Sequence, residues 1–182
     1  MITRERALEL LKEHVKTPNL VKHALAVEAV MRAFARKFGE DEEVWGLAGL
    51  LHDLDYEYTK DKPEEHCLRT LEFLKDEDVP QDVLDAILAH CDKKPREKLI
   101  EKVIYAVDPV TGFIVAAALV RPDKKLEGLK LKSLKKRFKE KAFARGASRE
   151  QMRSCEEFGV SLDEFLQISL DAMKEIADDL GL

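Results

Sequence analysis

The sequence contains few cysteines, and their spacing excludes the usual structural zinc site. The chain has three cysteines, Cys67, Cys91 and Cys155, and no two of them are separated by only two residues. Structural zinc sites built from cysteine normally use such closely spaced pairs. An odd number of scattered cysteines also favours a reducing compartment. We therefore expect a cytoplasmic protein.

The sequence also lacks an apolar leader and a strand-like alternation of polar and apolar residues. The segment 1–14 is charged from its start, so we expect neither a signal sequence nor a stretch long enough to span a bilayer. Apolar residues recur instead at helical spacing. This pattern predicts an all-α protein, a helical bundle with additional C-terminal helices.

Basic residues do not outnumber acidic ones. The formal net charge is −5, whereas proteins that bind nucleic acid or membranes usually present a basic face. We therefore expect neither a membrane nor a nucleic acid as a partner. The exception is the basic segment 130–141, which we interpret as the solvated face of an amphipathic helix with Leu131, Leu134 and Phe138 toward the core. Contact with nucleic acid or polyphosphate is the alternative.

Capping and turn residues divide the chain into helices. Thr3 and Asp41 can cap helix starts, Pro18 suits a first helical turn, and Gly39 suits a left-handed helix end. The segment 53–62 is polar and aromatic, and we expect a loop there. The expected helices cover about 3–14, 18–38, 41–52, 63–74, 81–90 and 97–119, with further helices after Ser148 and Ser161.

No internal repeat or low-complexity linker interrupts the chain, which at 182 residues is long enough to bury a core. We expect residues 1–182 to form one domain. Residues from about 19 to 122 would carry the chemistry, and helices from about 123 to 182 would support them.

Histidines are scarce, and four of the five lie where a free imidazole would be unfavourable. These four lie on apolar helical stripes or beside acids: His23, His52, His66 and His90. Asp53 follows His52 directly. A single buried histidine is usually a core residue with a satisfied hydrogen bond. Four together indicate a metal site, because a metal ion accepts nitrogen lone pairs that burial would otherwise leave unpaired.

A carboxylate in an apolar run is a further candidate ligand. Asp108 lies in the run VIYAVDPVTGFIVAAALV, where an unpaired charge would be unfavourable. Pro109 follows and should loosen the helix at that point. Capping of a segment that begins after Pro109 is the alternative role for Asp108, but the apolar surroundings favour the ligand role.

The order of these residues resembles that of a known superfamily. The elements of the resemblance are His23, the run LLHDLDYE around His52 and Asp53, and then His66, His90 and Asp108. They resemble the HD superfamily of metal-dependent phosphohydrolases, in particular its small HDIG-type members. The resemblance extends over about 19–122.

The resemblance implies a set of metal ligands and a chemistry. It implies that the core ligands are His23, His52, Asp53 and Asp108, and that His66 and His90 bind a second ion with Asp53 bridging. The cofactor would be one or two divalent ions of manganese, iron, cobalt, nickel or magnesium. A metal-activated water would attack a phosphoester or phosphoanhydride of a nucleotide, with Asp53 as the most important residue.

The sequence departs from the family motif directly after the His-Asp pair. The family has HDIGK where this chain has HDLDY, so Tyr56 replaces a lysine that lies near the substrate phosphate. Asp55 and Glu57 are candidates for a catalytic general base or water-orienting acid, and solvated loop acids are the alternative. The candidate substrate-binding cations are Lys60, Lys93, Lys94 and Arg121. Arg121 is the best placed, since it ends the predicted helix of Asp108; capping of that helix is its alternative role.

Three functions are compatible with the sequence. The first is a metal-dependent phosphohydrolase, with a layout similar to the symmetrical dinucleoside tetraphosphate hydrolases of the HD group. The second is a catalytically weak or inactive regulatory module that binds metal or nucleotide. The third, a purely structural helical protein, conflicts with the histidine pattern. The expected partner is a small-molecule nucleotide or phosphoester, and a homodimer is compatible with the sequence.

Overall fold

The computed structural model describes residues 1–182 and contains helices, turns and loops but no strand, so the predicted all-α class is confirmed. The α-helices are α1 (Arg4–His14), α2 (Pro18–Phe38), α3 (Glu42–Leu51), α4 (Tyr56–Thr59), α5 (Leu68–Leu74), α6 (Gln81–His90), α7 (Leu99–Leu119), α8 (Leu131–Lys139), α9 (Arg149–Arg153), α10 (Leu162–Glu175) and α11 (Ala177–Leu180). Two 3-10 turns are η1 (Pro63–Glu65) and η2 (Ser154–Phe158).

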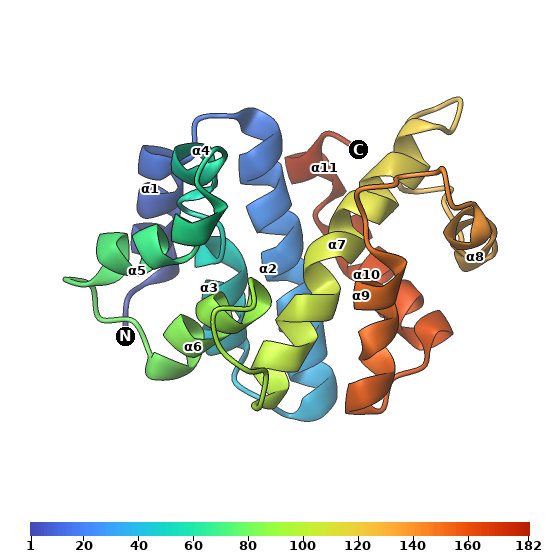
Figure 1. Ribbon diagram of the computed structural model, residues 1–182. Coiled ribbons are helices and arrows are strands. Elements are labelled where there is room, and N and C mark those ends of the chain that lie inside the picture. Colours follow the sequence, from blue (N-terminus) through green and yellow to red (C-terminus); the bar gives the residue numbers. More distant parts are fainter.

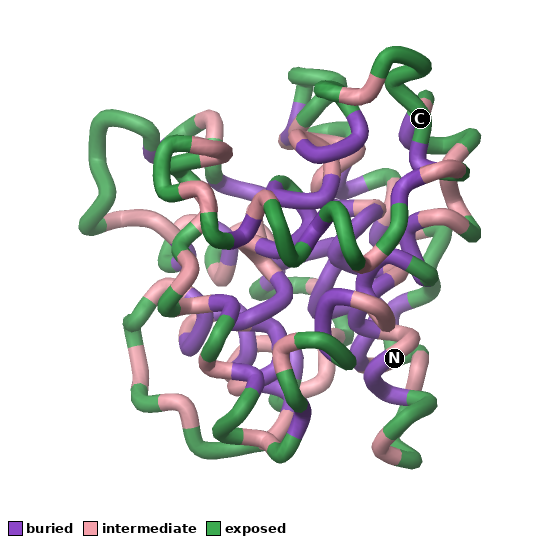
Figure 2. Tube along the Cα trace, turned by 90° about the vertical axis from the view of Figure 1, so that its right-hand side faces the viewer, coloured by how far each residue is buried: buried purple, intermediate pink, exposed green.

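The long helices α2 and α7 run side by side through the middle of the molecule (Figure 1). Helices α1 and α3 to α6 lie on one side of this pair, and α8 to α10 lie on the other. Buried side chains from both sides join in one apolar core, so the buried parts of the trace run through the centre and the loops lie outside (Figure 2). The central pair is therefore the scaffold on which both sides pack.

Local capping follows the sequence signals closely. Thr3 accepts a hydrogen bond from the N–H of Arg6 at 3.1 Å. Asp41 accepts from the N–H of Glu43 at 2.9 Å and thereby caps α3. Gly39 ends α2 with a φ of 68°, a conformation that glycine adopts without the penalty of a Cβ atom.

Pro109 lies inside α7, and the helix continues through it. Because proline has no N–H, the carbonyl of Tyr105 loses its usual helical donor. The side-chain amide of Gln151, on α9, donates to that carbonyl at 2.7 Å and replaces the missing bond. Helix α7 thus lacks one backbone hydrogen bond at Pro109 but does not break there, and Asp108 is an internal helical residue rather than a helix cap.

Helix α7 also corrects the expectation about membrane-spanning length. With 21 residues, it is long and apolar enough by composition to cross a bilayer. Its buried residues, which include Val103, Val107 and Phe113, belong to the common core of the bundle. Burial inside a bundle accounts for such an apolar composition equally well.

Two predicted boundaries between 53 and 74 differ from the structure. The expected loop contains the short helix α4. The helix expected from Pro63 breaks at Cys67, whose φ of 73° interrupts the helical course between η1 and α5. His66 therefore lies at a kink in the chain rather than on a helical stripe.

Helices α2 and α3 approach each other closely at Gly49. A Cβ atom at this position would lie 2.6 Å from the Cα and N atoms of Glu28 on α2, which is too close for any real contact. Glycine thus lets the two backbones touch. This contact sets the distance between His23, on α2, and His52, directly after α3.

Candidate metal centre

The first group of donors comes together from α2, α7 and the end of α3. His23 Nε2 lies 2.9 Å from Asp108 Oδ1, and His52 Nε2 lies 3.3 Å from the same oxygen. The two Nε2 atoms are 3.2 Å apart. Asp53 Oδ2 lies 3.7 Å from His52 Nε2 and 3.9 Å from His23 Nε2. We call this group half-site A.

The second group uses the other oxygen of the same aspartate. Asp53 Oδ1 lies 3.3 Å from His66 Nε2 and 3.6 Å from His90 Nε2. His66 comes from the kink before α5, and His90 is the last residue of α6. We call this group half-site B. Asp53 thus faces both half-sites, one oxygen to each.

All four histidines present Nε2 to the centre because Nδ1 is bonded elsewhere. His52 Nδ1 lies 2.7 Å from the carbonyl oxygen of Gly49, and His90 Nδ1 lies 2.6 Å from that of Ile87. The other two partners are side chains: Thr111 Oγ1 is 3.1 Å from His23 Nδ1, and Asp55 Oδ1 is 2.6 Å from His66 Nδ1. Bonds of this kind fix the ring orientation of metal-binding histidines.

The donor set fits divalent ions. Imidazole nitrogen and carboxylate oxygen together suit manganese, iron, cobalt, nickel and zinc. Two donors about 2.1 Å from one ion, at right angles, lie about 3 Å apart. The separations between the donors of His23, His52 and Asp108 are close to this value. The residues of half-site A therefore fit a divalent metal ion, and half-site B offers donors of the same kind.

The acids and imidazoles of the centre stabilise each other's charged forms. Burial opposes ionisation of Asp108, but hydrogen bonds from His23 and His52 hold its pKa below the ordinary value. Burial likewise opposes ionisation of Asp53, whose pKa is also lowered, chiefly by His52. Burial lowers the pKa of His52, but the neighbouring acids outweigh it and raise the pKa to about 9. Divalent ions compete with these protons, since histidine binds metal in its neutral form.

Asp55 and Glu57, the predicted catalytic acids, both face away from the two half-sites. Asp55 is fully buried behind His66, and its second oxygen accepts from the N–H of Thr70 at 3.0 Å. Hydrogen bonds to Asp53 and Asp55 raise the pKa of His66 to about 10. Glu57 accepts from the N–H groups of Lys16 and Thr17 at the start of α2. This geometry gives Asp55 a positioning role and Glu57 a capping role.

The predicted phosphate-binding cations Lys60, Lys93 and Arg121 are not among the residues that make up the two half-sites. Asp108 precedes the end of α7 by 11 residues, or about 16 Å of helix, and Arg121 lies beyond that end, paired with Asp123. The placement of Arg121 near the metals is therefore wrong. Lys60 is exposed without a polar partner, and Lys93 donates to the carbonyl of Pro63 at 3.3 Å.

A cleft of about 540 Å³ opens from half-site A across α7. His23, Asp53 and Asp108 line one end, together with Tyr56. The other end is lined by residues that the sequence did not indicate: Ala144, Gly146, Ala147, Ser148 and Gln151. These residues belong to the loop after α8 and to the start of α9, so no local sequence signal connects them to the histidines.

Comparisons with known proteins agree with this arrangement. Residues 20–154 match a family model described as HD domain. The chain is 27% identical over 165 residues to ribonuclease Y of Fusobacterium nucleatum, 25% identical over 186 residues to that of Lactobacillus acidophilus, and 26% identical over 163 residues to that of a Sulfurovum species. These matches cover 89%, 96% and 88% of this chain but 32%, 33% and 32% of the relatives. The chain thus spans about a third of their length. No solved structure matches.

The relatives also correct one expectation. They are named as ribonucleases, which overturns the expectation that nucleic acid is excluded as a partner. That expectation rested on net charge, which averages over the whole chain and does not register a local basic segment such as 130–141.

The family match and the arrangement of histidines and aspartates agree with the order of residues noted in the sequence. The matched region includes His23, the His52–Asp53 pair, His66, His90 and Asp108. All of them lie in the two half-sites. Because the HD domain model covers most of the chain, this protein belongs to the HD domain family.

Proposed function

We propose that this domain is a metal-dependent phosphodiesterase that cleaves single-stranded RNA. The observation that carries the proposal is the position of Asp53, whose two oxygens face two separate pairs of histidines. Such a carboxylate suits two ions that share one ligand. Paired divalent ions, when bound, supply positive charge to a phosphate and activate water for attack.

The residues of the chain hold and orient the reacting groups. The Nδ1 bonds of the four histidines keep their Nε2 atoms directed at Asp53 and Asp108. Asp53 is about one-fifth exposed and lines the cleft, so a phosphate in the cleft can approach it directly. Pre-set orientation of this kind lowers the reorganisation that the reaction requires.

The cleft has features that suit a polynucleotide. Tyr56 lines the cleft with 42% of its surface exposed, and its ring centre is 6.3 Å from that of His66. Exposed aromatic rings commonly stack on the bases of single-stranded nucleic acids. The names of the relatives support RNA as the polynucleotide. Tyr56, in place of the family lysine, would therefore recognise a base rather than a phosphate.

Helix α8 extends this surface with positive charge. The segment 130–141 contains seven lysines and arginines and one glutamate. Lys132, Lys136 and Lys139 are exposed on α8, and no carboxylate lies within ion-pairing distance of them. The loop that follows α8 lines the far end of the cleft. An RNA strand that leaves the cleft over this loop would place further phosphates on the basic face of α8.

Hydrolysis of a substrate panel tests the proposed function. Metal-free protein would be supplied separately with manganese, iron, cobalt, nickel and magnesium. The panel comprises a short single-stranded RNA, the DNA of equal sequence, duplex RNA, nucleotides and dinucleoside polyphosphates. We expect single-stranded RNA to be cleaved fastest. Metal binding without turnover of any substrate would instead favour the regulatory module, and exclusive turnover of the small nucleotides would exclude RNA.

Replacement of the three α8 lysines tests the basic surface separately. The combined change Lys132→Gln, Lys136→Gln and Lys139→Gln should raise KM for RNA. It should also make the slope of the logarithm of RNA affinity against the logarithm of salt concentration shallower by about 0.7 for each lost phosphate contact. Hydrolysis of bis(p-nitrophenyl) phosphate should not change, because this small diester cannot reach α8. Lys12, Lys75 and Lys125, exposed outside α8, provide a matched triple change. An equal effect of both triples would exclude a specific role for α8.

A further inference from the structure

Half-site B has two cysteines beside its histidines. Cys67 follows His66 directly in the sequence, and Cys91 follows His90. The structure brings the two sulfur atoms into bonding contact, with the Cα atoms 6.9 Å apart. The third cysteine, Cys155, is buried without a sulfur partner. The pair therefore joins the two chain segments that provide the half-site B histidines.

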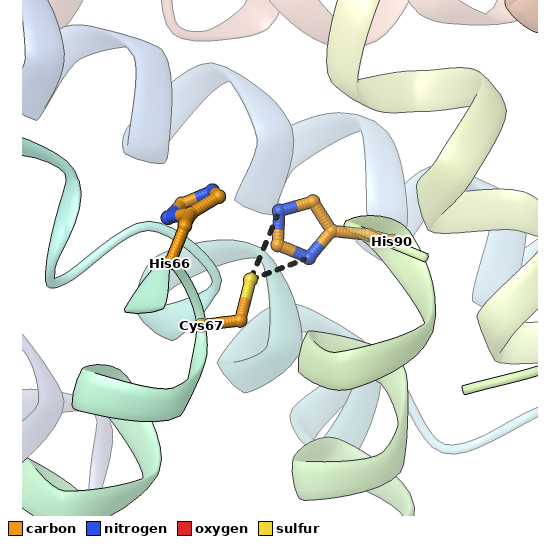
Figure 3. Close-up of side chains that lie close together, drawn as sticks. All are labelled: His66, Cys67 and His90. Atoms are coloured by element: carbon orange, nitrogen blue, oxygen red, sulfur yellow. Dashed lines mark hydrogen bonds between the residues drawn. The ribbon is translucent and has the colours of Figure 1, made fainter. Parts of the chain in front are cut away.

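Cys67 is directed at the metal-binding rings. Figure 3 shows its sulfur pointing to the ring of His90, with the ring of His66 beside it. The sulfur lies 3.8 Å from Nδ1 and 4.0 Å from Nε2 of His90. One donor atom from each of His66, Cys67 and His90 lies within 4.8 Å of the others. This arrangement places a sulfur donor beside the two nitrogen donors.

The backbone of Cys67 supports a functional role. Its φ of 73° lies in the left-handed region, which residues with a Cβ atom rarely adopt. The residue is also fully buried. Strained conformations of this kind persist where the surroundings fix them, and they are frequent at functional sites. Here the strained peptide holds the Cys67 sulfur next to half-site B.

We propose that reduced Cys67 is a ligand of the ion in half-site B, and that disulfide formation with Cys91 withdraws it. The chain otherwise offers this ion two nitrogens and one oxygen of Asp53. A thiolate makes a fourth donor and favours softer ions such as zinc and cobalt over magnesium. The proposal rests on the metal role of half-site B in the proposed function, but not on RNA as substrate.

Hydrogen peroxide is the oxidant of the proposed step. Cys91 is partly exposed, and its sulfur attacks one peroxide oxygen, so that the oxygen–oxygen bond breaks and a sulfenic acid and water form. The Cys67 thiolate then attacks the Cys91 sulfur, the sulfur–sulfur bond forms, and the sulfenic oxygen leaves as hydroxide. A disulfide sulfur has no thiolate charge to offer a metal ion, so the oxidised half-site keeps only three donors.

Cobalt absorption tests the proposal without any substrate. Cobalt(II) bound to reduced protein should give thiolate-to-cobalt charge-transfer absorption in the near ultraviolet. Half-site A contains no sulfur and cannot produce this signal. The absorption should be present in Cys91→Ser and absent in both Cys67→Ser and Cys67→Gly. The glycine variant is included because glycine adopts the left-handed backbone conformation without strain. Zinc affinity at half-site B should fall by about tenfold or more in both Cys67 variants.

Peroxide treatment tests the withdrawal of the ligand. Oxidised wild-type protein should lose the charge-transfer absorption and two titratable thiols, and dithiothreitol should restore both. Cys155→Ser serves as the control and should behave as wild type in absorption. An unchanged cobalt spectrum in the Cys67 variants would overturn the ligand role, and an oxidised protein that keeps the absorption would overturn the withdrawal. Neither readout depends on hydrolysis of RNA.

Discussion

Half-sites A and B share Asp53, yet the chain builds them differently. Half-site A takes its other donors from the interior of α2, the interior of α7 and the end of α3. Half-site B takes His66 from a kink beside a strained residue and His90 from the last position of α6. Packing of long helices thus fixes half-site A, whereas local hydrogen bonds at a kink and at a helix end fix half-site B. Substitutions should therefore separate the two.

The largest effect is expected at the residue common to both. Asp53→Asn should remove the shared carboxylate and weaken the binding of both ions. The rate of RNA hydrolysis should fall by about a thousandfold or more. Elemental analysis and initial rates would measure the two effects. Asp61→Asn, an exposed acid without hydrogen-bond partners, is the matched control. Unchanged metal content in Asp53→Asn would contradict the shared role.

Asp55 provides a change confined to half-site B. Asp55→Asn cannot accept bonds from both His66 and the N–H of Thr70 as the carboxylate does. Loss of such an orienting acid should weaken metal binding in half-site B by about 10–100-fold and leave metal binding in half-site A unchanged. Calorimetric titration of metal-free protein would resolve the two affinities. Equal weakening of both ions would show that the half-sites are not separable.

Thr111 provides the matched change for half-site A. Thr111→Val keeps the shape of the side chain but removes the hydroxyl that bonds His23 Nδ1. The Thr111 hydroxyl is neutral, and α2 also fixes the His23 ring. We therefore expect metal binding in half-site A to weaken by only about tenfold, the lower end of the 10–100-fold range for such supporting bonds. The same titration should show no change in half-site B. A larger effect than that of Asp55→Asn would reverse the comparison.

The last expected effect concerns stability rather than metal binding, at the helix that carries Asp108. Gln151→Leu leaves the carbonyl of Tyr105 without a donor and should lower the free energy of unfolding by about 1–3 kcal/mol. Urea unfolding would measure this change. Gln81→Leu, which removes an exposed side-chain bond, should have almost no effect. Equal loss in both variants would mean that Gln151 does not support α7 at Pro109.

The capped helices and the histidine positions were predictable because their signals are local. Thr3, Gly39 and Asp41 act as the sequence indicates, and the spacing of apolar residues predicts α2 and α7. All six expected ligands, His23, His52, Asp53, His66, His90 and Asp108, lie in the two half-sites. Imidazole and carboxylate groups in apolar runs indicated several of these ligands, such as His23 and Asp108, and the resemblance to the HD superfamily supplied the complete set.

The remaining features depend on contacts between distant segments. Nothing near Pro109 shows that Gln151 would complete its helix. Cys67 and Cys91 each follow a histidine of the motif, which makes them candidate neighbours, but the contact between their sulfur atoms depends on the fold. Asp55 and Glu57 look alike in sequence, but one bonds a histidine and the other caps α2. Arg121 and Asp108 are joined by one helix in the sequence, but the length of that helix keeps the guanidinium far from the metal ligands.

Gly49 has a consequence for how this sequence can vary. At most surface positions of a helix many side chains are tolerated, but position 49 has no room for even one carbon atom beside the α2 backbone. Its carbonyl oxygen also lies within bonding distance of His52 Nδ1. Alanine would force α2 and α3 apart and move His23 away from His52. In a library that varies every residue, position 49 should tolerate as few replacements as the metal ligands, although glycine has no side chain with which to bind anything.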